Sequence, residues 1–105
     1  MNGLYMLDAE HRLIPTDDVV AWANWFEKAD RNVAVDKVGN ITVSTVFLGI
    51  DHRFVGDGQP IVFETMLFAD GESAGDYQER CCTWDEAVAQ HAKALALALV
   101  TGKSS

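Results

Sequence analysis

Cysteine is scarce in this chain of 105 residues, and its two cysteines, Cys81 and Cys82, are adjacent. Neighbouring cysteines rarely bridge, because the backbone between them must be strained, and two thiols cannot build a disulfide framework. Two ligands are also too few for a structural zinc site unless histidines from elsewhere join them. We therefore expect reduced structural thiols, no metal and no other cofactor.

Positive charge is also in short supply. Eight basic residues stand against sixteen acidic ones, which gives a formal net charge of −8. Binding to a phosphate backbone needs a surplus of lysine and arginine, so we expect no generic nucleic-acid binding. The excess acid has two interpretations. It can simply keep the protein soluble, or it can form an acidic face that docks onto a basic protein surface.

Long apolar runs are missing as well. No run approaches the roughly 20 residues that span a bilayer. The N-terminal sequence MNGLYMLDAEHR lacks the basic and then apolar segments of a secretory signal. We expect no membrane association and a cytoplasmic location. The length of 105 residues is typical of one domain, and 49% of the residues are hydrophobic. We therefore expect a single domain, residues 1–105, around one core.

The first third of the chain predicts a hairpin and a helix. LYML and RLIP are two short extended pieces joined by a polar turn, and Pro15 ends the second. A helix is expected to follow in TDDVVAWANWFEKA, with Thr16 or Asp17 as its N-cap. Its apolar stripe, at helical spacing, is formed by Val19, Trp22, Ala23 and Phe26.

The middle of the chain predicts strands. NVAVDKV and ITVSTVFL flank Gly39-Asn40, a strong hairpin signal, and Val33, Val35 and Val38 are expected near the core. GIDHRFVGDGQP is a loop, IVFETMLF a third strand, ADGESAGD a second loop and YQERCC a fourth strand.

The last element begins with a capping box formed by Thr83 and Glu86. A helix should run from Trp84 to about Val100 and end at Gly102, with an apolar stripe formed by Trp84, Val88, Leu95 and Leu99. The predicted fold class is α+β: an antiparallel three- to four-stranded meander with two helices packed on one face.

Glu64 is a candidate site residue because it interrupts an apolar strand. Alternation places it on one face with Val62, Met66 and Phe68. A partly buried carboxylate needs a partner or a raised pKa, and the candidate partners are Arg53, Arg80 and His52. Glu64 is therefore either a general base or ligand anchor, or one half of a structural pair.

Asp51 and His52 form a second candidate, since an imidazole beside a carboxylate can be polarised for acid–base chemistry. Neighbours on an extended chain point to opposite sides, so a turn with a surface histidine is the alternative. His91 is either a half-buried core residue or a ligand. A metal site of Asp51, His52, Glu64 and His91 would have no recognised ligand spacing, and no hydrolase, P-loop, dinucleotide or His-Glu-x-x-His motif occurs.

Several segments together carry a resemblance: WANWFEKADRNVAVDKVGN, VSTVFLGIDHRF, FETMLF and TWDEAVAQH. They resemble a group of short uncharacterised proteins of bacteriophages and prophages, over roughly residues 17–91. ADGESAGD and the Cys81-Cys82 pair depart from the group's usual pattern. The resemblance implies an accessory factor that acts on host machinery, and it supplies no catalytic residue.

We therefore expect a non-enzymatic protein that binds and blocks or sequesters a host component, of the anti-defence type. A nucleotide ligand would meet Arg53, Arg80 or Arg31 at its phosphates and stack on Trp25 or Phe54, with His91 as a further ligand-binding candidate. The rivals are a small hydrolase or lyase that uses His52 with Asp51 or Glu64, and a minor virion or assembly protein. Homo-oligomers are expected if helices cover only one face of the sheet.

Overall fold

The computed structural model of the chain describes residues 3–51, 59–69 and 72–103. Three candidates from the sequence, His52, Arg53 and Phe54, lie outside the described residues. Their proposed roles in acid–base chemistry, phosphate binding and stacking therefore stay predictions.

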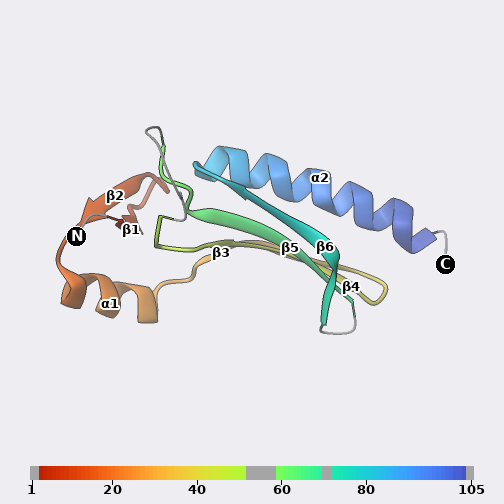
Figure 1. The fold of residues 1–105 in the computed structure, drawn as a ribbon, viewed down its shortest axis with the longest axis horizontal. Coiled ribbons are helices and arrows are strands. Elements are labelled where there is room, and N and C mark those ends of the chain that lie inside the picture. Colours follow the sequence, from red (N-terminus) through yellow and green to blue (C-terminus); the bar gives the residue numbers. More distant parts are fainter. Residues whose placement is uncertain (1–2, 52–58, 70–71, 104–105) are drawn as a thin grey trace.

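A four-stranded antiparallel sheet forms the centre of the molecule, in the order β3-β4-β5-β6 (Figure 1). Its strands are β3 (Asn32–Val38), β4 (Ile41–Phe47), β5 (Phe63–Ala69) and β6 (Glu72–Cys81). Each strand pairs with the next one along the chain, so the sheet is a meander. The long helix α2 (Trp84–Lys103) packs on one face and contacts β3, β4 and β5. The α+β class and the meander are confirmed.

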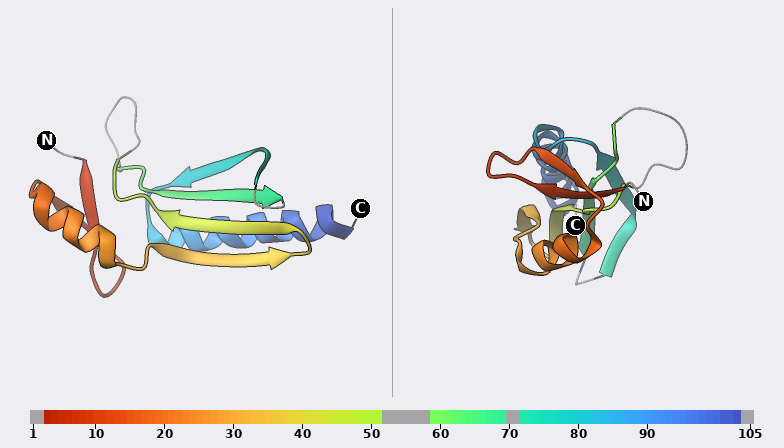
Figure 2. Two further views of the ribbon diagram at one scale, coloured as in Figure 1. Left: turned by 90° about the horizontal axis from the view of Figure 1, so that it is seen from below. Right: turned by 90° about the vertical axis from the view of Figure 1, so that its left-hand side faces the viewer.

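The predicted N-terminal hairpin is also present, as β1 (Leu4–Leu7) and β2 (Leu13–Thr16). Helix α1 (Val19–Lys28) packs against β1, and both lie at one end of the four-stranded sheet (Figure 2). The indole Nε1 of Trp22 donates to the carbonyl of Tyr5 at 3.1 Å, which ties the helix to the hairpin. The N-cap is Asp18, whose carboxylate accepts from Ala21 N at 3.0 Å; the predicted caps Thr16 and Asp17 were wrong.

The core lies between α2 and the sheet. Alternate residues of β4 and β5 point toward the helix and are buried. Val62, expected beside Glu64, is instead fully buried, because it precedes β5 and packs in the core with Phe63. Val35, expected near the core, is 51% exposed. A β-bulge between Asn32 and Ala34 makes Val33 an extra residue, so the alternation of β3 changes phase there.

Helix α2 begins as predicted but turns a different face to the sheet. Thr83 Oγ1 accepts from Glu86 N, and Glu86 Oε1 accepts from Thr83 N, both at 3.1 Å, so the capping box is confirmed. The helix continues through the predicted stop at Gly102 to Lys103. Its buried residues are Ala87, His91, Ala94 and Ala98.

Two residues of the stripe predicted for α2, Val88 and Leu99, are 49% and 45% exposed. Small alanines let the helix approach the sheet closely, while the aromatic rings of Phe47 and Phe63 fill the space between them. The loop predicted from ADGESAGD is shorter than expected, because β6 already begins at Glu72. An irregularity in the β5–β6 pairing between Met66 and Phe68 accommodates this additional strand.

Candidate functional site

A chain of polar side chains runs through the buried layer to the exposed carboxylate of Asp36. His91 Nε2 lies 2.7 Å from Asp36 Oδ2, and His91 Nδ1 lies 2.8 Å from Thr45 Oγ1. The hydroxyls of Thr45 and Thr65 are 2.6 Å apart. Gln90 Nε2 donates to Thr65 Oγ1 at 2.8 Å. We call these five side chains the polar network.

Strand register brings the network together. Thr45 and Thr65 are direct partners in the β4–β5 ladder, and both lie on the face that α2 covers. Sequence reasoning singled out His91 but missed Thr45, Thr65, Asp36 and Gln90. The available signal was a threonine at an inward position of each of two neighbouring strands, where every other inward residue is apolar.

One set of hydrogen-bond directions gives every donor in the network an acceptor. Gln90 Nε2 also donates to the backbone carbonyl of Glu79 at 3.0 Å, which orients its amide. In this set, Thr65 Oγ1 accepts from Gln90 and gives its own proton to Thr45, which in turn donates to His91 Nδ1. His91 then donates from Nε2 to the Asp36 carboxylate. Every donor meets an acceptor when the imidazole is neutral and carries its proton on Nε2.

Hydroxyl, imidazole and carboxylate stand in the same order as in a nucleophilic triad. The polar network differs from such a triad because its hydroxyl is not accessible to a substrate. The side chains of Thr45 and Thr65 are fully buried and His91 is 5% exposed, so a substrate cannot reach the Thr45 hydroxyl in this arrangement. The network instead satisfies the polar groups beneath α2 and fixes the rotation of the helix.

Glu64 lies on the opposite face of the sheet. Its Oε2 accepts from Arg80 Nε at 2.8 Å and also from the Gln78 amide. Arg80, its direct neighbour across the β5–β6 ladder, was one of the three partners proposed from the sequence. Glu64 and His91 face opposite sides of the sheet and cannot join one site. Among residues 3–51, 59–69 and 72–103, no group of three metal-ligating side chains gathers.

Asp51 joins the two ends of the loop that the sequence predicts. Its Oδ1 accepts from the backbone N of Ile61 at 3.0 Å, and its own backbone N donates to the carbonyl of Gly3 at 2.8 Å. Asp51 therefore links the start of this loop to its end and to the N-terminal strand.

Two ligand-binding candidates, Trp25 and Arg31, are engaged by neighbouring rings. Trp25 meets Phe47 edge-on, with centroids 5.8 Å apart and an interplanar angle of 85°. The Arg31 guanidinium carbon lies 3.7 Å from the centroid of the Phe26 ring. Trp25 is half-buried in the core, and the Arg31 cation is stacked on an aromatic face.

The outer side of α1 combines exposed apolar and acidic residues. Val19 and Val20 are 58% and 71% exposed, although Val19 and Ala23 were expected to face inward. Trp22 and Phe26, stacked with centroids 4.7 Å apart, contribute the inner side instead. We define the α1 face as six exposed acidic or apolar residues: Asp17, Asp18, Val19, Val20, Ala23 and Glu27. Ala21, Asn24 and Lys28 are also exposed on the same helix.

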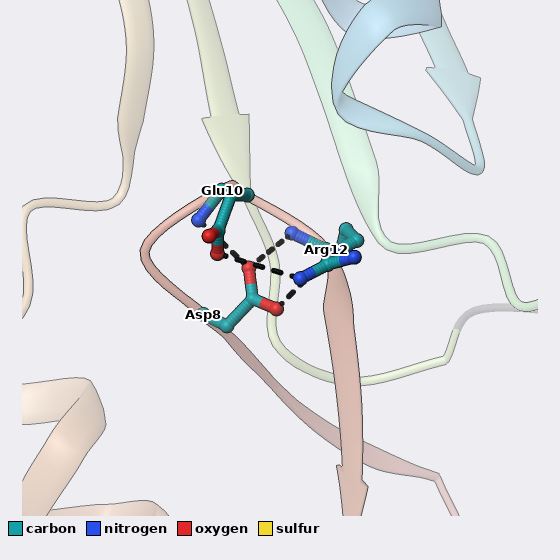
Figure 3. Close-up of polar contacts among 3 residues, drawn as sticks. All are labelled: Asp8, Glu10 and Arg12. Atoms are coloured by element: carbon teal, nitrogen blue, oxygen red, sulfur yellow. Dashed lines mark hydrogen bonds and ion pairs between the residues drawn. The ribbon is translucent and has the colours of Figure 1, made fainter.

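The tip of the β1–β2 hairpin is held by charge and reaches the start of α2. Asp8 Oδ1 accepts from the backbone N of Glu10 and of Arg12, each at 2.9 Å, and Asp8 Oδ2 pairs with Arg12 Nε at 3.1 Å (Figure 3). The His11 ring stacks on Trp84, with centroids 3.7 Å apart. A shallow cavity of about 230 Å³ lies between residues 10–13 and 83–85.

No protein-family model, curated protein or solved structure matches this chain. Within the part of the chain that the structure describes, no helix combines the length and apolar character needed to cross a membrane. The segments VSTVFLGIDHRF, FETMLF and TWDEAVAQH, quoted above for the resemblance, contribute Thr45, Thr65 and His91 to the polar network.

Proposed function

We propose that the protein is a non-enzymatic binding protein of bacteriophage or prophage origin that blocks a host protein, and that the α1 face is its docking surface. One observation carries the proposal. Val19 and Val20 are largely exposed on a short helix, with the carboxylates of Asp17, Asp18 and Glu27 beside them.

This combination suits a basic partner with an apolar pocket. Protein interfaces place apolar side chains at the centre and polar groups at the rim. Burying a valine that is exposed in the free protein contributes about 1 to 2 kcal/mol. The carboxylates, within a chain of net charge −8, accelerate the approach of a positively charged surface and reject acidic ones.

Among the described residues, the cationic ligand-binding candidates Arg80, Arg31 and His91 support a protein target over a nucleotide. Arg80 is held by Glu64, and Arg31 is stacked on Phe26. His91 is buried in the polar network. A nucleotide ligand would have to draw these groups out of existing contacts before they could meet its phosphates. The hydrolase alternative relies on His52, which lies outside the described residues, and the burial of Thr45 leaves no accessible nucleophile in the polar network.

Site-specific photo-crosslinking tests the proposal. A photoreactive amino acid replaces Val20 in the protein expressed in host cells, and a matched variant carries it at the exposed Lys37 of β3. We expect a discrete adduct with one basic host protein from position 20 and none from position 37. Replacing Asp17 and Asp18 by asparagine keeps the side-chain size and the N-cap, and should weaken this adduct at least tenfold. Equal adducts from both positions would refute the α1 face as the docking surface.

Native mass spectrometry of the protein purified from the same cells distinguishes protein blocking from sequestration of a nucleotide signal. We expect the mass of the chain without a small ligand. A retained nucleotide, released on denaturation, would replace protein blocking by sequestration of a signal.

A further inference from the structure

Beyond its first turn, which carries the exposed Asp85 and Glu86, the outer side of α2 has no acid, and its exposed Lys93 pairs with Glu79. Residues 87–100 contain no aspartate or glutamate. Val88, Leu99 and Val100 are 49%, 45% and 69% exposed, and three alanines between them are exposed as well. These side chains recur at helical spacing and form one stripe. We call it the α2 outer stripe: Val88, Ala89, Ala92, Ala96, Leu99 and Val100.

The order of residues in this stripe is nearly symmetric about position 94. Val88 and Val100 are equally far from that position, and so are Ala92 and Ala96. The third pair at equal distance from position 94 is Ala89 and Leu99, which combines a small side chain with a large one. An antiparallel pair of identical helices related by a two-fold axis brings together residues in this way. In such a pair, each residue of the stripe would meet an apolar residue of the partner.

We propose that the α2 outer stripe is a self-association surface, on which two copies of the chain pack α2 against α2 in antiparallel orientation. Ala92 of one copy meets Ala96 of the other beside the two-fold axis, where the small side chains allow close approach of the helices. Val88 meets Val100 at each end. This inference goes beyond the proposed function and is independent of the α1 face.

Charge favours a second copy over other occupants. Two chains of net charge −8 repel each other most strongly through acid-rich surfaces such as the α1 face, and least through a stripe without acid. The same net charge opposes docking on an anionic lipid surface. A basic protein would gain no charge complementarity from this stripe.

The dimer should be weak. One helix pair buries less than the roughly 800 Å² per partner of a standard interface, so we expect a dissociation constant in the micromolar range. The salt dependence of the affinity distinguishes this dimer from binding at the α1 face. Screening of the two acidic chains should tighten this dimer, whereas it should weaken the binding of a basic partner to the α1 face.

Sedimentation velocity over a range of protein concentrations tests the proposal with the full chain. We expect the wild type to shift from monomer to dimer in the micromolar range. Ala96→Glu places a charge beside the two-fold axis and should raise the dissociation constant at least tenfold. Asn24→Glu adds the same charge at an exposed position of α1 and should leave it unchanged. A wild type that stays monomeric at several hundred micromolar overturns the proposal.

Isotope-filtered NMR on a mixture of labelled and unlabelled protein identifies the surface directly. Intermolecular contacts between the methyl groups of Val88 and Val100 are expected. A dimer whose contacts arise only from the sheet face with Glu64 and Arg80, or from α1, would also overturn the proposal. Circular dichroism of Ala96→Glu confirms that the variant remains folded, so that loss of the dimer is not loss of the fold.

Discussion

His91 of α2 donates from Nε2 to the carboxylate of Asp36 in β3 at 2.7 Å, although the two residues are 55 positions apart in the chain. The other imidazole nitrogen, Nδ1, lies 2.8 Å from Thr45 Oγ1, so a single buried side chain connects α2 to two strands. Because buried polar groups are costly when unpaired, this arrangement selects one rotation of the helix.

Removing the Thr45 hydroxyl should destabilise the protein. Thr45→Val keeps the shape of the side chain but leaves His91 Nδ1 and the Thr65 hydroxyl without their partner. We expect a loss of about 1 to 3 kcal/mol in the free energy of unfolding, measured by urea denaturation. Thr42→Val, on the opposite face of the same strand, serves as the control and should change it by less than about 0.5 kcal/mol.

The same variant tests the assignment of the proton. In the wild type, imidazole ¹⁵N chemical shifts should show the Nε2–H tautomer of His91 at neutral pH. A spectrum with the proton on Nδ1 would contradict the hydrogen-bond directions given above. In Thr45→Val, Nδ1 loses its hydrogen-bond donor, so its ¹⁵N signal should move toward that of an unbonded imidazole nitrogen.

Replacement of Gly49 should be far more costly than replacement of Gly39. Both glycines have positive φ, at +76° and +60°, so alanine is strained at either position. At Gly49 a Cβ would also lie 2.7 Å from Cε1 of Phe26 and 3.3 Å from Cζ2 of Trp22, whereas at Gly39 nothing lies within 4 Å.

We expect Gly39→Ala to cost about 1 kcal/mol and Gly49→Ala at least twice that, because the rings of Phe26 and Trp22 in α1 must move away from position 49. Thermal unfolding of the two variants provides the comparison. Equal losses would show that backbone strain alone decides the outcome.

The hairpin tip should confer a pH dependence in the acid range. Backbone donation from Arg12 lowers the pKa of Asp8 below its ordinary value of 3.8. The folded state therefore holds the proton less tightly than the unfolded state. The stabilisation is fully present above about pH 4 and is lost as the pH falls through the lowered pKa. The difference in melting temperature between the wild type and Asp8→Asn should shrink over that range, and a constant difference would contradict the assignment.

Cys81 should react slowly. Burial, assisted by the nearby carboxylate of Glu86, raises the pKa of the Cys81 thiol to about 11. Iodoacetamide at pH 8 should alkylate it at least tenfold more slowly than in the urea-unfolded chain, because the thiolate is the reactive form. The raised pKa stabilises the fold below pH 9, and this contribution is lost as the pH rises toward 11. Peptide mass spectrometry separates Cys81 from Cys82.

Local signals in the sequence determined most of the elements. Gly39-Asn40 between two β-rich runs specified the β3–β4 hairpin, and Thr83 with Glu86 specified the start of α2. Arg80 was among the partners proposed for Glu64, since the number of cations near it in a small sheet is limited. Such signals act between residues a few positions apart, or across one predicted pairing, and can be recognised without the rest of the fold.

Only the tertiary structure decided which faces these elements present. The apolar pattern of α2 permits more than one inward stripe, and the contact of His91 with Thr45 and Asp36 selects the alanine stripe. Val88, Leu99 and Val19 then remain exposed. The bulge at Val33 likewise arises from pairing with β4. Helix rotation and strand phase depend on distant partners, because a side chain is buried only by what packs against it.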